Sequence, residues 1–178
     1  MNKIALICCL IATNILVTGC GSDKRQQATC TTEIDVNLPA EGSDRNSMNF
    51  NRLNPITYNA STSISLADFS GEVYINTIYF VKTDEQPNTW DLYFFFDDVA
   101  LDIPSGEAGS KGQYKAQLQF DDLGRLITIV PDPILSEKLI LNDENYFYIV
   151  EYIFSKSFTT QLDSGFAVSA LSNYCVVN

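Results

Sequence analysis

The sequence contains no histidine among its 178 residues. The commonest general base and zinc ligand is therefore missing, together with every nucleophile that a histidine activates. Lysine and arginine are also scarce, with 11 of them against 22 aspartates and glutamates. Because contacts to nucleic-acid phosphates depend on basic side chains, this charge balance excludes nucleic acid as a partner. We expect a chain that is not an enzyme and that needs no cofactor and no metal.

The sequence has one apolar run near its N-terminus and no long apolar run after it. This run, residues 4–17, follows Lys3 and has 14 residues, whereas a transmembrane helix needs about 20. A short apolar run after a basic start is typical of an export signal. The run leads into Leu16-Val17-Thr18-Gly19-Cys20, which resembles the lipobox of bacterial lipoproteins. We therefore expect residues 1–19 to be a lipoprotein signal peptide and Cys20 to carry the lipid. The alternative is an ordinary export signal with a cysteine near its cleavage site.

The residues after Cys20 indicate where the lipidated chain resides. In lipoproteins of enteric bacteria, aspartate directly after the lipidated cysteine favours the inner membrane, and this chain has Gly21 there. We expect an outer-membrane protein held by its N-terminal lipid, on either the periplasmic or the surface face. Residues 20–30 are interpreted as a polar lipidated tether, which spans at most roughly 33–36 Å when extended. The tether would keep the domain close to its membrane.

Five cysteines are present, and three of them belong to the predicted export and lipid-attachment region. The other two, Cys30 and Cys175, lie near the two ends of the mature chain. In an oxidising compartment two remaining cysteines usually pair, so we expect a disulfide, with two separate thiols as the alternative. The Cα atoms of the pair would lie about 4.4–6.8 Å apart. Closing so long a loop would stabilise the fold by about 4–5 kcal/mol.

The chain that follows residues 1–19 has the length of one domain and can enclose a buried core. It carries 10 basic and 22 acidic side chains, a net charge of −12, because the signal removes only Lys3. Residues 31–60 are polar and rich in turn formers. From Ser61 onward, short segments alternate apolar and polar residues, which is typical of strands. We expect residues 31–178 to form one β-domain.

After the strand pattern that begins at Ser61, each further expected strand is rich in β-branched and aromatic residues and is bounded by turn formers. They are residues 73–82, 90–96, 113–120, 126–130, 138–141, 146–154 and 166–171. No segment sustains the 3.6-residue period of a helix. The pattern predicts an all-β fold, either a single antiparallel β-barrel or a closed β-sandwich of about seven or eight strands. In the first hairpin we expect Trp90 to be partly or wholly buried, and Ile78 and Phe80 to face away from Tyr79 and Val81.

Six segments, taken in order along the chain, carry a family resemblance. They are EIDVNLP at 33–39, FNRLNPITYN at 50–59, STS with DFSG at 61–71, IYFVKT with NTW at 78–90, LQFDDLGRL at 118–126, and TQ with GFAVSALS at 160–172. Together they resemble the outer domain of the bacterial flagellar hook protein, with its "sTYN", "YFVKT…NTW", "LTFDSNGxL" and "FAVSSLSQ" segments. The likeness spans roughly residues 33–173 and implies a single β-barrel-like domain.

The chain also departs from that family. Hook subunits have helical terminal segments and an inner β-domain, and no segment of this sequence resembles either, so we expect that this chain does not polymerise as a hook does. It resembles an outer domain that has been detached and fixed to a membrane. We expect a non-enzymatic outer-membrane lipoprotein with a structural or interaction role, associated with the flagellar hook or basal body. The alternative is an envelope ligand-binding module, for a glycan or a secreted protein partner, that only shares the fold.

Two groups of carboxylates are candidates for binding a cation. Asp97 and Asp98 with Asp102 form one group, and Asp121 with Asp122 forms the other. Such oxygens are the ligands that Ca²⁺ prefers. Aspartate is equally favoured in turns, where its side chain bonds to the local backbone. The spacing matches no known calcium loop, and the turn interpretation is favoured.

Two aromatic runs, residues 93–96 and residues 146–148 with Tyr152, have two interpretations as well. They form either a stacking surface for a glycan or partner, or part of the core. Successive strand residues face opposite sides of a sheet, so half of each run is expected in the core. One exposed face would indicate a docking patch, whereas two buried faces would indicate none.

Overall fold

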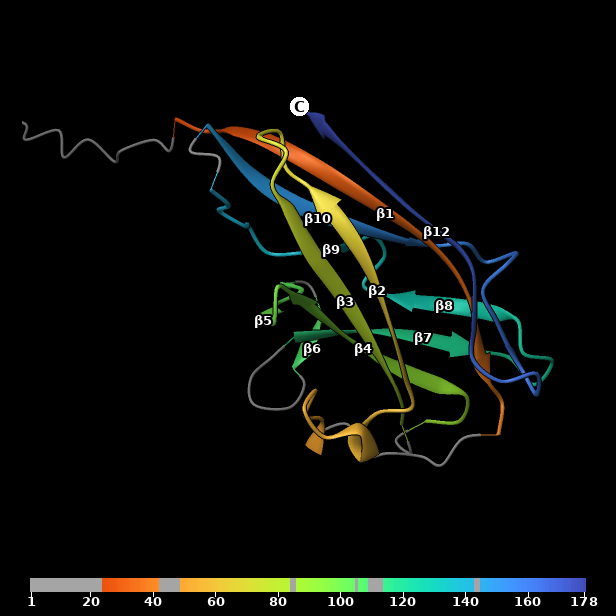
Figure 1. The fold of residues 1–178 in the computed structure, drawn as a ribbon. Coiled ribbons are helices and arrows are strands. Elements are labelled where there is room, and N and C mark those ends of the chain that lie inside the picture. Colours follow the sequence, from red (N-terminus) through yellow and green to blue (C-terminus); the bar gives the residue numbers. More distant parts are fainter. Residues whose placement is uncertain (1–23, 42–48, 84–85, 105, 109–113, 143–144) are drawn as a thin grey trace, which may run out of the picture.

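The computed structural model describes residues 24–41, 49–83, 86–104, 106–108, 114–142 and 145–178. Within these ranges the chain forms twelve strands in two sheets (Figure 1). The predicted all-β class is confirmed, and the described part of the chain has no helix long and apolar enough to cross a membrane. The predicted signal peptide and Cys20 lie outside the described residues.

The first sheet is organised around the N-terminal strand. Its members are β1 (Gln26–Pro39), β9 (Ile134–Leu135), β10 (Tyr146–Phe154), β11 (Thr160–Leu162) and β12 (Ala167–Val177). Strand β1 pairs with β12 along one edge and with β10 and β11 along the other. Its pairing with β12 is antiparallel, whereas those with β10 and β11 are parallel. The sheet is therefore mixed, and not antiparallel throughout as expected.

The second sheet is antiparallel and follows the chain order more closely. Its members are β2 (Ala60–Ala67), β3 (Val73–Lys82), β4 (Thr89–Phe96), β5 (Val99–Leu101), β6 (Glu107–Ala108), β7 (Tyr114–Phe120) and β8 (Leu126–Val130). Strands β2, β3, β4 and β7 lie side by side in that order. Each consecutive pair is joined by hydrogen bonds between antiparallel neighbours, as expected for strands connected by short turns.

The main core lies between the two sheets, because alternate residues of the facing strands point inward. In β3 and β4 these include Ile78, Phe80 and Trp90, each at most 1% exposed. The predicted burial of Trp90 is confirmed. Tyr79 and Val81 face the other way and pack in a second, smaller cluster, so the predicted alternation is confirmed as well.

Contacts at both lateral edges hold the sheets together without closing a barrel within the described residues. On one side, the Asn173 side chain of β12 donates to the backbone carbonyl of Ser65 in β2. On the other, the turn between β7 and β8 meets β11, where the Gln161 amide donates to the Gly124 carbonyl at 2.8 Å. Of the two predicted architectures, the β-sandwich therefore fits.

Two boundaries differ from those expected. Strand β1 begins at Gln26, so residues 26–30 belong to the sheet and not to the tether. The turn-rich interpretation of residues 31–60 is also wrong as far as Pro39, where β1 ends. Conversely, residues 138–141 form no named strand, and Leu139 pairs with Tyr148 of β10 as an isolated bridge. This segment borders the sheet edge, where it has one strand beside it and not two.

Cys30 and Cys175 form the predicted disulfide. They occupy directly opposed positions in β1 and β12. Their Cα atoms are 4.0 Å apart, closer than the expected window, because opposed residues of antiparallel strands approach to about 4.5 Å where no ladder hydrogen bonds join them. The bond fixes the first described strand to the last.

Gly124 is required by the contact between the β7–β8 turn and β11. Its φ is +74°, and a Cβ added there would lie 1.9 Å from the Gln161 carbonyl oxygen. Gly124→Ala is expected to lower the free energy of unfolding by about 3 kcal/mol, because the turn must move off β11 and also adopt a strained backbone. Urea unfolding measures the loss.

Gly71 provides the matched control for this variant. Its φ is +89°, but an added Cβ would have no atom within 4 Å. Gly71→Ala is therefore expected to cost only the backbone term, about 1–2 kcal/mol. Equal losses in the two variants would contradict a specific role for the Gly124 contact.

Candidate interaction surface

Residues 49–59 lie on the outer face of the second sheet, at the end of the molecule opposite the start of β1 (Figure 1). We call this segment the distal loop. Its Phe50 is buried and stacks on Tyr93 of β4, with ring centroids 4.2 Å apart and planes at 10°. Tyr58 meets Tyr79 of β3 edge to face, with centroids 4.9 Å apart. Aromatic packing of this kind fixes both ends of the distal loop on the sheet.

Two asparagines determine the path of the loop between those anchors. The Asn51 carboxamide oxygen accepts a hydrogen bond from the Leu53 amide at 3.1 Å. The Asn54 carboxamide oxygen accepts one from the Ile56 amide and begins the single turn of 3₁₀ helix η2 (Pro55–Thr57). Side chains of this type stabilise turns by bonding to the backbone two residues ahead. The motif similar to "sTYN" therefore builds an ordered loop.

The distal loop presents two large apolar side chains to solvent, Leu53 at 75% exposure and Ile56 at 69%. Beside them, the Arg52 guanidinium bonds to the Asp98 carboxylate at 2.6 Å and lies 5.5 Å from the centroid of the Phe95 ring. We call Leu53, Ile56 and Arg52 the distal surface. Groups held on an ordered backbone lose little conformational freedom when they bind a partner, so this arrangement suits docking.

Asp97 and Asp98 of the first group form the β4–β5 turn, whereas Asp102 follows β5 and bonds through its backbone to Glu137. Asp97 and Asp98 both have positive φ, 44° and 69°, as a two-residue hairpin turn requires. The Asp97 carboxylate accepts from the Ile75 amide at 2.6 Å, and Asp98 pairs with Arg52. The turn interpretation is confirmed for this pair, and the described residues contain no group of three metal-ligating side chains.

Asp121 of the second group has the same kind of role. Its carboxylate accepts hydrogen bonds from the Leu123 and Arg125 amides and forms an ion pair with the Arg125 side chain. The Arg125 amide, followed by the Arg125 guanidinium, lowers the pKa of Asp121. A carboxylate bonded in this way stabilises the hairpin turn between β7 and β8.

The first aromatic run is buried on both of its faces. All eight side chains of β4 are buried. Phe94 and Phe96 face the main core, whereas Tyr93 and Phe95 lie in the cluster that the distal loop covers. Residues 93–96 are therefore part of two cores, and no docking patch is formed there.

The second run is divided between core and surface. Tyr148 and Tyr152 are buried, and the Tyr152 hydroxyl donates to the Asn76 side chain at 3.0 Å. Burial raises the pKa of Tyr152, so the phenol stays protonated. Phe147 is only partly buried, and the Lys138 ammonium lies 3.7 Å from its ring centroid. This pair is a cation–π contact on the outer face of the first sheet.

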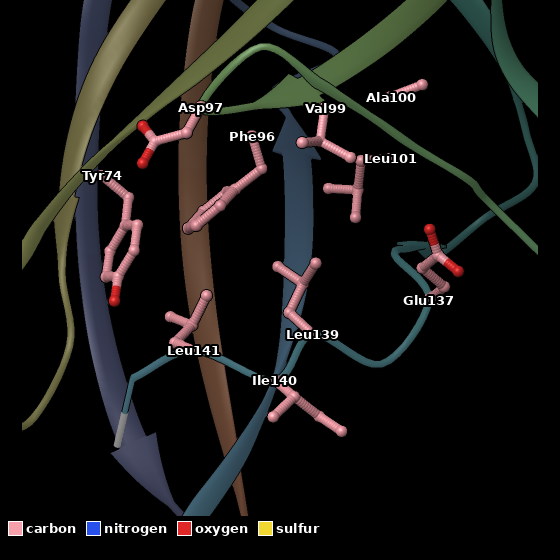
Figure 2. Close-up of a pocket in the computed structure, with 10 residues that line it drawn as sticks. All are labelled: Tyr74, Phe96, Asp97, Val99, Ala100, Leu101, Glu137, Leu139, Ile140 and Leu141. Carbon is pink, nitrogen blue, oxygen red and sulfur yellow. The ribbon is translucent and has the colours of Figure 1, made fainter. Parts of the chain in front are cut away.

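A separate cavity of about 260 Å³ opens at the side of the sandwich, between the β4–β5 turn and residues 137–141 (Figure 2). We call it the side pocket. It is lined by Tyr74, Phe96, Asp97, Val99, Ala100, Leu101, Glu137, Leu139, Ile140 and Leu141. The walls of the side pocket come from segments that are far apart along the chain. The carboxylate groups and the aromatic runs of the sequence therefore did not predict a cavity here.

Comparison with known families shows to which family the β-sandwich and the distal loop belong. Residues 37–173 match the family described as "Flagellar basal body protein FlaE D2 domain", which is more than three quarters of the chain. The chain belongs to the FlaE D2 domain family. The predicted resemblance to the outer domain of the flagellar hook protein is thereby confirmed, and the distal loop and the side pocket both lie within the matched residues.

Among solved structures, the FlaE D2 chain is similar to a 32 kDa fragment of the flagellar hook protein FlgE from Caulobacter crescentus. The two are 14% identical, with a TM-score of 0.42, over 65% of this chain and 46% of the fragment. The similarity thus spans less than half of the fragment. No curated protein sequence matches the chain.

Both disulfide cysteines lie outside the matched FlaE D2 residues, Cys30 before residue 37 and Cys175 after residue 173. The outer parts of β1 and β12 therefore extend the family domain, and the bond joins these extensions. Cys20 lies beyond them in the part of the chain that the structure does not describe, so its lipidation remains a prediction.

Proposed function

We propose that this FlaE D2 domain is a non-enzymatic lipoprotein of the outer membrane with a structural or interaction role at the flagellar hook or basal body. Its lipid is attached at Cys20, and its partner binds at the distal surface. Membership of a flagellar structural family supports the role, and the string Leu16-Val17-Thr18-Gly19-Cys20 supports the anchor. A shared fold alone does not determine a shared role. The proposal therefore rests on where the membrane anchor and the distal loop lie in the domain.

The observation that carries it is the separation of the anchor from the distal loop. Strand β1 begins six residues after Cys20, so the tether spans at most about 20 Å. The 14 residues of β1 extend for about 46 Å. Beyond its far end, Lys82 donates its amide to Asn59 and its ammonium to the Ala40 carbonyl, which joins the distal loop to the chain after β1. The distal surface is thus presented away from the membrane, within reach of a structure that crosses the envelope.

The alternative role, an envelope ligand-binding module, is favoured by one observation. The side pocket is an apolar cavity that the proposed docking does not use. A deletion strain separates the two roles, because loss of a hook partner alters hook assembly or swimming, whereas loss of a ligand-binding module leaves both normal.

The anchor is tested by labelling cells with a palmitate analogue. We expect the label on the wild-type protein, and we expect Cys20→Ala to abolish both the label and membrane fractionation, because the thiol carries the lipid. Cys9→Ala is the control, since that cysteine lies within the predicted signal peptide and its variant should retain the label. A Cys20→Ala protein that still fractionates with the membrane would contradict the anchor.

The docking role is tested by the double variant Leu53→Ser/Ile56→Ser. Both side chains are exposed, so the free energy of unfolding should change by no more than about 0.5 kcal/mol. The affinity for isolated hook–basal bodies, measured by co-sedimentation, should fall by about thirtyfold, because two apolar contacts of about 1 kcal/mol each are lost.

Leu123→Ser is the matched control. Leu123 is 70% exposed but lies in the β7–β8 turn, away from the distal loop. Its variant should co-sediment as the wild type does. Unchanged co-sedimentation of the Leu53→Ser/Ile56→Ser protein would place the partner elsewhere on the domain.

A further inference from the structure

The side pocket has an apolar interior. Tyr74 and Phe96 stack on one wall, with ring centroids 5.2 Å apart, and Leu101 and Leu139 belong to or pack against the main core. The Tyr74 hydroxyl donates to Asp68 and accepts from the Asn142 amide. Its two hydrogen bonds hold the tyrosine in place and leave its ring as the surface offered to an occupant.

The charge at the side pocket has one sign. Asp97 and Glu137 lie on opposite sides of it (Figure 2), and no lysine or arginine is among its lining residues. One oxygen of each carboxylate bonds to a backbone amide, that of Ile75 or Asp102. Each carboxylate therefore has a second oxygen available to a cation. The nearest lysine in sequence, Lys138, is placed over Phe147.

The size of the cavity limits its occupant. At about 260 Å³, the side pocket is slightly smaller than the roughly 300 Å³ at which ligand pockets begin. It accommodates one aryl group or one short alkyl group. Aromatic ring faces attract cations as well as apolar groups, so the wall formed by Tyr74 and Phe96 and the two carboxylates favour the same chemistry.

We propose that the side pocket binds a small amphipathic cation, an aryl or short alkyl group that carries an ammonium. The apolar part packs against Phe96, Leu101 and Leu139, and the ammonium lies at the mouth beside Glu137. This site is independent of the distal surface and of the anchor, and it holds whether or not the domain binds a hook.

The test uses three probes of similar size and different charge, 2-phenylethylammonium, 2-phenylethanol and 3-phenylpropanoate. Each is titrated into the full-length protein and followed by ligand-observed NMR. The dissociation constant of the ammonium is expected to be about tenfold lower than that of the alcohol, because the carboxylates attract only the cation, whereas the apolar wall contacts the phenyl group of every probe. The carboxylate probe should bind more weakly than either.

Variants assign the binding to the pocket. Glu137→Gln should remove most of the preference for the cation, whereas Glu33→Gln, an exposed acid on β1, should leave it unchanged. Leu139→Asn should weaken the binding of all three probes. Val99→Ser should do the same without disturbing the core, because Val99 is 68% exposed. Equal affinity for the three probes, or cation binding that neither Glu137→Gln nor Val99→Ser reduces, would overturn the proposal.

Discussion

Cys30→Ala/Cys175→Ala is expected to lower the free energy of unfolding by about 5 kcal/mol, because the bond spans 145 residues and the entropy of so long a closed loop is large in the chain-entropy model. Alanine is chosen for both sites because Cys30 is fully buried, where a serine hydroxyl would add a separate penalty. Denaturant unfolding at equilibrium measures the loss.

Reductant provides the control for this experiment. Added to the wild-type protein, it should lower the free energy of unfolding by a similar amount, and added to the double variant it should change nothing. A double variant that unfolds within about 1 kcal/mol of the wild type would show that strand pairing between β1 and β12 alone carries the stability.

The second large effect is expected at a buried ion pair on the outer face of β4 and β7. The Lys115 ammonium lies 2.6 Å from the Asp91 carboxylate, with the two side chains 3% and 0% exposed. The Gln117 amide donates to the other carboxylate oxygen at 2.8 Å. Lys115→Met is expected to cost about 3–5 kcal/mol, because it leaves the carboxylate buried without its counter-ion.

A double-mutant cycle measures the interaction between the two side chains. Asp91→Leu should cost as much as Lys115→Met, since it strands the ammonium. Asp91→Leu/Lys115→Met should recover most of the loss, because well-packed apolar residues often replace a buried pair without penalty. If the two single losses instead add in the double variant, the pair does not act as a unit.

The hairpin of β3 and β4 was predictable because its residues alternate strongly and a turn-forming segment separates them. Strand β1 carries the same signal in weaker form. Its inward residues are Cys30, Thr32, Ile34, Val36 and Leu38, with Glu33, Asp35 and Asn37 between them. The threonine and the polar outward residues lower the apolar content of β1, so its period of two is weak in the sequence. Hydrogen bonds to strands on both edges stabilise β1 in the sheet despite its low apolar content.

The candidate sites show where local sequence stops being informative. Phe50 and Tyr58 flank the distal loop in the sequence, but whether they cover Tyr93 and Phe95 depends on strands that come much later in the chain. Exposure of Leu53 is set by the same packing. The side pocket joins Phe96 to Leu139, and no spacing in the chain relates two walls so far apart.

The place of β1 also determines when this protein can fold. All strands paired with β1 come from the C-terminal end of the chain, in β10, β11 and β12. A nascent chain therefore holds its first strand without a neighbour until synthesis is almost complete. Sheets built from such distant contacts form slowly, so β1 is among the last strands to be paired. Truncation of the chain before β10 would remove every described strand that pairs with β1.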